Sequence, residues 1–209
     1  MKKDNSEANL KTLFTLILLI VLLVVGTGAC ASRSLSKALP GSWSEDINLT
    51  NNSASSKYPS AAIDDNIIHL VWQDNRNGEY EIYYKRSMDN GGTWAQQRLT
   101  YSGNSVYPSV AVNGSSVHVV WQDDRDGCNC IYYMRSTDYG ENWDFGVAPL
   151  YSSYQSSEHP RIAVNGSNLY VVWQEYIYYD FYNVYFVFSC NYFLFYIVIY
   201  FHTFTTQKI

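Results

Sequence analysis

Basic charge and cysteine are both scarce in this 209-residue chain. Lysine and arginine number 14 against 19 aspartate and glutamate residues, so the formal net charge is −5. No basic stripe is present, and nucleic acid is therefore not an expected partner. Of the four cysteines, Cys128 and Cys130 would place two thiols on one face of a strand. Two thiols are too few for a structural zinc site, which needs four ligands.

Metal-binding loops are lacking as well. The turns at residues 74–78 and 123–127 are rich in Asp, which offers the oxygen ligands that calcium prefers. Their spacing matches no EF-hand loop, and an arginine stands in the middle of each turn. We therefore expect no metal and no cofactor. The Cys128–Cys130 pair is interpreted as tolerated substitutions or a disulfide, and Cys190 has no evident partner.

Two octapeptides follow one pattern. Residues 87–94 read Ser-Met-Asp-Asn-Gly-Gly-Thr-Trp, and residues 136–143 read Ser-Thr-Asp-Tyr-Gly-Glu-Asn-Trp. Asp followed two residues later by Gly favours a turn, Ser and Thr add local hydrogen bonds, and Trp anchors the next strand. Because the pattern recurs, a structural role is predicted for Ser87, Asp89, Gly91, Thr93, Trp94, Ser136, Asp138, Gly140 and Trp143.

A longer repeat surrounds these octapeptides. Three similar apolar stretches end at Trp72, Trp121 and Trp173. The spacing between these tryptophans suits the length of a four-stranded propeller blade. In the first copy the strands are expected at residues 58–63, 67–73, 80–86 and 94–99. The second strand is apolar on both faces and must be covered on both. His69 and His118 occupy equivalent positions in it, so they are expected to pack between blades and not to bind a ligand.

The octapeptide resembles the Asp-box, or BNR repeat, of sialidase-like β-propellers, and the resemblance covers roughly residues 41–175. It implies an all-β fold, an incomplete sialidase-like β-propeller of four-stranded antiparallel blades. We expect one blade at residues 58–106 with its Asp-box at 87–94, a second at 107–158 with its box at 136–143, and the start of a third at 159–175. Residues 33–57 are expected to hold a linker and the outer strand of an incomplete blade.

The N-terminal residues 1–32 predict a hydrophobic signal or anchor helix. Two lysines precede an uncharged run from Thr12 to Ser32. The run could be a cleaved signal peptide, a retained membrane anchor, or a lipoprotein signal with Cys30 as the lipidation candidate. All three alternatives place the remaining chain outside the cytoplasm, either secreted or anchored at the cell surface.

The C-terminal residues 176–209 depart from the repeat. Beyond Glu175 the chain becomes rich in Tyr, Phe, Val and Ile, and residues 181–204 contain no Gly, no Pro and no Asp-box. A truncated or frame-shifted gene is the favoured explanation. A membrane segment from Val184 to Phe204 is the alternative, although Tyr, Asn and His suit it poorly.

Blade geometry separates two faces of the molecule. The Asp-boxes are third turns, whereas the turns at 74–78 and 123–127 are second turns and lie on the opposite face together with the links between blades. In the sialidase family this opposite face carries the active site. The resemblance implies there an arginine triad for the sialate carboxylate, a Tyr nucleophile assisted by Glu, and an Asp acid/base.

The catalytic pieces are not recognised in this chain. The family's Phe/Tyr-Arg-Ile-Pro motif is absent, so no catalytic residue is assigned. Arg76, Arg125 and Arg161 are the candidates for ligand contact. The alternative for Arg76 and Arg125 is that Asp–Arg pairs brace the turns, because both turns repeat in register.

The sequence thus predicts an exported propeller fragment that binds glycans or cell-surface proteins without catalysis, its membrane contact made by the N-terminal segment. The alternatives are an exo-sialidase-type glycoside hydrolase, whose catalytic residues lie outside this chain, and a truncated gene remnant. Since so few blades cannot close a ring, exposed strand edges predict that residues 33–209 self-associate or aggregate.

Overall fold

The computed structural model describes residues 44–144, 149–151, 155–176, 182–190 and 193–195. The chain divides into two compact units, Met1–Leu49 and Thr50–Ile209. All strands of the described residues lie in the second unit. The expected N-terminal helix and Cys30 lie outside the described residues. Within the described part of the chain, no helix is long and apolar enough to span a membrane.

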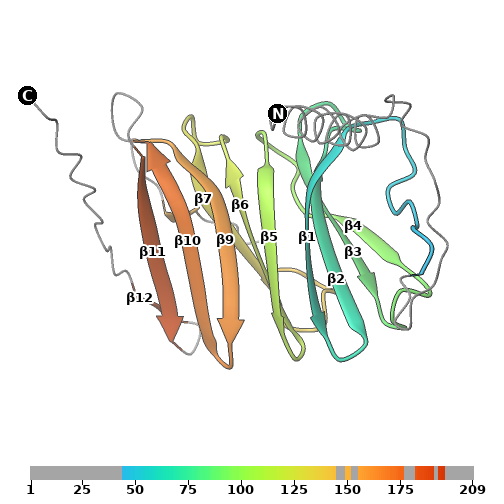
Figure 1. The fold of residues 1–209 in the computed structure, drawn as a ribbon. Helices are drawn as coiled ribbons and strands as arrows, with labels where there is room; N and C mark the ends of the chain where they lie inside the picture. The colour runs from blue at the N-terminus through green and yellow to red at the C-terminus, as the bar shows by residue number, and fades with distance from the viewer. Residues whose placement is uncertain (1–43, 145–148, 152–154, 177–181, 191–192, 196–209) are drawn as a thin grey trace, which may run out of the picture. The chain divides into compact units, whose positions relative to one another are not determined.

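Twelve strands form three sheets of four strands each, and within each sheet every strand pairs antiparallel with the next (Figure 1). The first sheet contains β1 (Ser56–Asp64), β2 (Ile67–Asp74), β3 (Glu81–Ser87) and β4 (Ala95–Arg98). The second contains β5 (Val106–Asn113), β6 (Ser116–Asp123), β7 (Cys130–Ser136) and β8 (Pro149–Tyr151). The third contains β9 (Ser157–Asn165), β10 (Asn168–Tyr176), β11 (Tyr182–Cys190) and β12 (Phe193–Phe195). For the described residues, the prediction of an all-β fold of four-stranded antiparallel sheets is confirmed.

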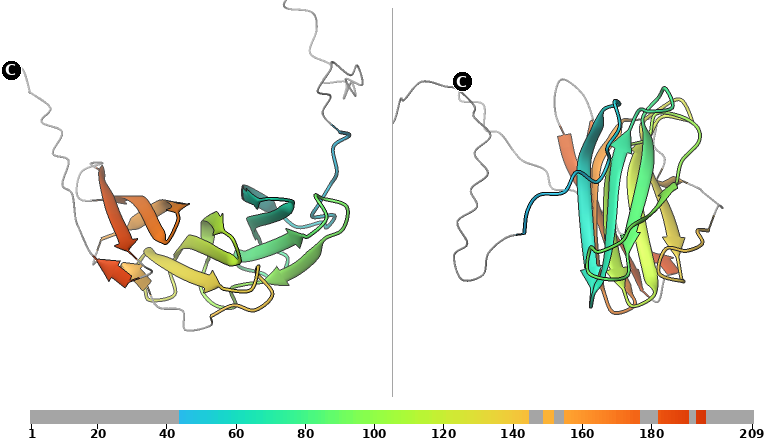
Figure 2. Two further views of the ribbon diagram at one scale, coloured as in Figure 1. Left: turned by 90° about the horizontal axis from the view of Figure 1, so that it is seen from below. Right: turned by 90° about the vertical axis from the view of Figure 1, so that its right-hand side faces the viewer.

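The sheets pack face to face in chain order, with the first strands β1, β5 and β9 side by side (Figure 2). Between the first and second sheets, Val71 and Tyr84 meet Val119 and Trp121 in one buried apolar cluster. A second cluster joins the second and third sheets through side chains that include Val120 and Trp173. Each sheet has the meander of a propeller blade, and its apolar second strand is covered by its neighbour.

Both ends of the repeat differ from the expected boundaries. Residues 44–55 form no strand, so the outer strand expected before residue 57 is not seen in them, and β1 begins at Ser56. At the other end, the repeat pattern stops near Glu175, yet β11 pairs with β10 along its whole length. Tyr185, Val187 and Ser189 are buried in alternation with more exposed residues, which is the period-two burial of a sheet strand. The origin of residues 176–209 stays a prediction.

The Asp-box turns are braced by their own side chains. Asp89 accepts hydrogen bonds from the Thr93 amide and hydroxyl, both at 2.8 Å, and from Ser87 at 2.8 Å. The second box repeats these contacts around Asp138. The hydrogen bonds lower the pKa of both carboxyl groups to about 2.

The second Asp-box also contacts the first sheet. Tyr84 donates a hydrogen bond to the Tyr139 carbonyl at 3.3 Å, Arg86 donates to the same oxygen at 2.9 Å, and the Tyr84 ring packs edge-on against Trp143. Because a Cβ on Gly140 would overlap the Tyr84 hydroxyl, glycine is needed here for close approach as well as for its positive φ of 81°.

We predict that Gly140→Ala destabilises the protein by about 1–3 kcal/mol more than Gly91→Ala. Gly91 is the matched control because it holds the same box position with a positive φ, and its nearest neighbour to an added Cβ lies 3.8 Å away. Urea unfolding monitored by tryptophan fluorescence measures the difference. Equal losses would show that the box of the second sheet does not depend on close contact with Tyr84.

His69 and His118 lie fully buried in equivalent positions of β2 and β6. Each ring nitrogen Nδ1 pairs with a tyrosine hydroxyl, Tyr84 at 2.7 Å and Tyr133 at 2.8 Å, with the rings stacked. Burial lowers the pKa of both histidines from 6.5 to about 4. They are therefore neutral packing groups at neutral pH.

We predict that the free energy of unfolding falls as the pH drops from about 6.5 to about 4. In this window the unfolded chain binds protons at both histidines, whereas the folded chain, with its lowered histidine pKa values, does not. His69→Gln should reduce the slope of stability against pH without abolishing it, since His118 remains. Urea titrations across this pH range test the slope, and a wild-type slope in His69→Gln would exclude His69 as a source.

Candidate functional site at the second-turn end

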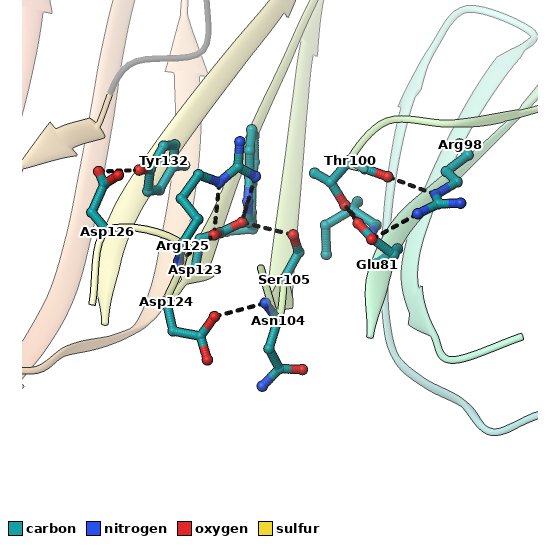
Figure 3. A network of polar contacts seen from close by, with 12 residues as sticks. Glu81, Arg98, Thr100, Asn104, Ser105, Asp123, Asp124, Arg125, Asp126 and Tyr132 are labelled. Carbon is teal, nitrogen blue, oxygen red and sulfur yellow. Dashed lines mark hydrogen bonds and ion pairs between the residues drawn. The ribbon is translucent and has the colours of Figure 1, made fainter. Parts of the chain in front are cut away.

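Two aspartate clusters occupy one end of the first and second sheets, around Asp74 and Asp123. Figure 3 shows the cluster around Asp123 and, beside it, the contacts of Glu81 with Arg98 and Thr100. Asp74 accepts hydrogen bonds from the Arg76 side chain at 2.9 and 2.7 Å and from its amide at 3.0 Å. Ser56 and Trp72 add donors at 2.7 and 3.1 Å. Around Asp123 the same five bonds come from Arg125, Ser105 and Trp121.

These carboxyl groups are ionised despite full burial. Burial alone would raise the pKa of Asp74, but hydrogen bonds from Arg76, Ser56 and Trp72 outweigh it and hold the pKa well below its usual range. The pKa of Asp123 is lowered by the same balance, and the paired carboxylates raise the pKa of both arginines. A buried charge is tolerable only with such a set of partners.

The structure holds Arg76 and Arg125 in their own turns. Each guanidinium forms a bidentate pair with its aspartate and stacks on a tyrosine ring, Tyr83 at 4.3 Å and Tyr132 at 4.6 Å. The arginine side chains keep 22% and 20% of their surface exposed. These contacts are those of a turn brace, while ligand contact by either arginine stays a prediction.

Arg161 does not join these clusters. It lies exposed on β9 and donates to the Pro160 carbonyl at 2.8 Å. It takes the place that Ser60 and Ser109 hold in the first two sheets. In the sequence, Glu175 and Ile177 stand where the first two repeats have an Asp and an Arg, and Ile177 lies outside the described residues. The three predicted ligand arginines are therefore not brought together.

A row of three rings stands at the same end of the sheets. Tyr58, Tyr107 and His159 are the second or third residues of β1, β5 and β9, and each precedes a proline. The rings of Tyr58 and Tyr107 lie 4.5 Å apart, and those of Tyr107 and His159 lie 4.0 Å apart. Three sheets thus contribute to one continuous aromatic surface, and Tyr58 is half exposed on it.

All three ring residues have a strained backbone. Their φ angles are 52°, 53° and 54°, in the left-handed region that bulky residues avoid and that a following proline disfavours further. At two of the three positions the strained amide donates a hydrogen bond to a glutamine of the preceding sheet. Tyr107 donates to Gln73 at 2.9 Å, and His159 donates to Gln122 at 3.3 Å. Strain that the surrounding structure maintains in register is typical of functional positions.

The sequence predictions placed these residues on the correct face but did not include them among the site residues. The signal is an aromatic residue before proline that recurs at each link, but sequence alone does not give the sign of φ. The Tyr107 pKa is raised, chiefly by the Tyr58 side chain and then by burial. At neutral pH Tyr107 is therefore a neutral phenol, which can stack and form hydrogen bonds.

Metal ligands do not gather in the described ranges, where no group of three His, Cys, Asp or Glu side chains could hold an ion. Cys128 and Cys130 are not joined by a disulfide, their sulfur atoms lie 3.1 Å apart, and Cys130 is buried. Their proximity fits the expectation that both side chains share one face.

No protein-family model and no curated protein matches this sequence. Solved structures with similarity to the chain include Zg3597, a family 117 glycoside hydrolase of Zobellia galactanivorans, with a TM-score of 0.49 and 12% identity over 69% of this chain and 55% of that chain. A Trypanosoma rangeli sialidase has a TM-score of 0.49 and 14% identity over 65% of this chain and 28% of that chain. The catalytic domain of the Coprinopsis cinerea GH62 α-L-arabinofuranosidase has a TM-score of 0.45 and 16% identity, covering 64% and 45%. The matched region thus spans little more than half of the first of these proteins and less than half of the others.

We predict that Asp123→Asn destabilises the protein by about 3 kcal/mol, because it leaves Arg125 at a buried site without its counter-charge. Asp124→Asn is the matched control. It removes the same charge one residue away, but Asp124 is exposed and its single bond from the Asn104 amide needs only an oxygen, so its effect should stay within about 0.5 kcal/mol. Chemical unfolding compares the two. Similar losses would mean that the cluster does not stabilise the turn.

Proposed function

We propose that this chain is part of an exported, sialidase-like Asp-box propeller that binds glycans through the row Tyr58–Tyr107–His159 and does not cleave them. The observation that carries the proposal is the strained, contiguous row of rings at the starts of β1, β5 and β9. Aromatic faces are a common lining of ligand sites, where a few polar groups set the orientation.

Groups that donate hydrogen bonds and groups that accept them lie beside the row of rings. Glu158 and His159 form a pair at 3.9 Å, and the two tyrosine hydroxyls can donate to or accept from sugar hydroxyls. Arg76 and Arg125 lie at the same end of the sheets and keep part of their guanidinium surface exposed. A glycan with a carboxylate is therefore a suitable ligand class.

The absence of catalysis is part of the proposal. It rests on the sequence, which lacks the Phe/Tyr-Arg-Ile-Pro motif of the family that the Asp-boxes resemble. Export rests on the sequence pattern of residues 1–32, and the membrane or cell-surface location is proposed on that ground alone.

We predict that Tyr107→Ala weakens binding to an oligosaccharide by about three- to tenfold, the value of one aromatic contact. The full chain is titrated with a panel of neutral and sialylated oligosaccharides, and affinities are measured by calorimetry or on a glycan array. Tyr101→Ala is the control, because Tyr101 is exposed near this end but belongs outside the row.

Failure of the wild-type chain to bind any glycan in the panel would overturn the proposal. An equal loss in Tyr101→Ala would show that binding does not use the row. Hydrolysis of a fluorogenic sialoside by the purified chain would contradict the non-catalytic part and favour the hydrolase hypothesis.

A further inference from the structure

The junction between neighbouring sheets is built twice from the same parts. From the first sheet Val71 faces the second sheet, and from the second sheet Val120 faces the third; both are 0% exposed. The side chain that Val71 meets is Val119 of the second sheet, and the one that Val120 meets is Val171 of the third sheet. Val119 and Val171 lie one position before Val120 and Val172, so they point to the opposite face of their own strand. Each sheet thus presents one face forward along the chain and a different face backward.

Polar bonds repeat at the two junctions as well. Gln73 accepts a hydrogen bond from the Tyr107 amide, and Gln122 accepts one from the His159 amide. The Ser60 hydroxyl accepts the Val110 amide at 3.2 Å, and the Ser109 hydroxyl accepts the Ile162 amide at 3.3 Å. At these four bonds the earlier sheet supplies the acceptor and the later sheet supplies the amide, whereas Tyr84 and Arg86 of the first sheet donate to the Tyr139 carbonyl of the second. The two sides of a junction are therefore different.

One forward face and one backward face have no covering sheet in the described part of the chain. On the third sheet, Val172 stands in the position of Val71 and Val120 but is 37% exposed, and Gln174 stands in the position of Gln73 and Gln122. On the first sheet, Leu70 stands in the position of Val119 and Val171 and is only half-buried, while Ile63 is 62% exposed.

We propose that these two faces bind each other between two copies of the chain. The third sheet of one copy packs on the first sheet of the second copy, and a two-fold axis generates the same junction on the other side. Two copies bring six sheets together, within the roughly four to eight blades of closed propellers. The occupant is a second copy because the open faces carry the two complementary halves of a junction that this chain already forms twice.

Closure completes the aromatic row. Gln174 of one copy accepts the Tyr58 amide of the second copy, as Gln73 and Gln122 do within the chain. Tyr58 of the second copy then follows His159, and the row becomes continuous around the pair. This association is independent of the ligand that the row binds.

One position departs from the repeat. Arg161 replaces the serine acceptor of the first two junctions, and a guanidinium cannot accept a hydrogen bond from an amide. We therefore expect the junction between copies to be weaker than the internal ones. Arg161→Ser restores the acceptor and should tighten the pair.

Sedimentation of the full chain in a non-ionic detergent tests the proposal. The wild type should be a closed dimer at micromolar concentration, and Val172→Arg should raise the dissociation constant at least tenfold. Met88→Arg is the matched control, because Met88 is 49% exposed and Thr137, its counterpart in the second Asp-box, stays exposed at the internal junction; it should leave the dimer unchanged. Circular dichroism confirms that each variant is folded.

A mixing experiment identifies the two faces. Leu70→Asp alone should also dissociate the dimer. An equimolar mixture of the Leu70→Asp and Val172→Arg chains should recover dimers, because one junction gains an Arg–Asp pair and the other is wild type. A wild-type monomer, open-ended growth, a dimer that survives Val172→Arg, or a mixture that stays monomeric would each overturn the proposal. The glycan titration of the wild type is read separately, so either proposal can fail alone.

Discussion

Strands that are apolar on both faces determine how this molecule is built. β2 and β6 present apolar side chains on each side, so no single sheet can keep both faces out of water. Stacking of whole sheets solves the problem, and it does so with the same positions at each junction. In the first and second sheets, the antiparallel meander then places the second turn at one end and the Asp-box at the other. At the Asp-box end, the Asn90 and Tyr139 amides donate hydrogen bonds to carbonyl groups of the first turns.

The two ends of the sheets are stabilised by different chemistry. At the Asp-box end, exposed aspartates accept bonds within their own turn, and the turn shape depends on glycine. At the opposite end, buried aspartates draw Trp, Ser and Arg donors from three segments into one cluster, which fixes the link to the preceding sheet. Tyr58 and Tyr107 lie two residues after Ser56 and Ser105, which donate to these aspartates, and the Tyr107 and His159 amides donate to a glutamine of the preceding sheet. Rigid support of this kind is what a binding surface requires.

Sequence reasoning could identify the strands and turns because their signals are local and repeated. The alternation in β2 and the Asp-x-Gly turns lie within a few residues, and the observed strands begin and end within two residues of their expected positions in the first sheet. It could also place Arg76 and Arg125 in the second turns, with the turn-brace alternative. It could not give the left-handed φ of Tyr58, Tyr107 and His159, which at Tyr107 and His159 comes with an acceptor glutamine from another sheet. Nor could it show β11, whose Tyr- and Phe-rich sequence carries no turn or box of the repeat and is placed by pairing with β10.

The glutamine–amide contacts follow the order in which the sheets are synthesised. Each acceptor belongs to the sheet made earlier during synthesis, and each strained amide belongs to the sheet that follows it. Because synthesis runs from the N-terminus, Gln73 is made before Tyr107, and Gln122 is made before His159. At these two positions the acceptor glutamine therefore precedes, in order of synthesis, the strained amide that it binds.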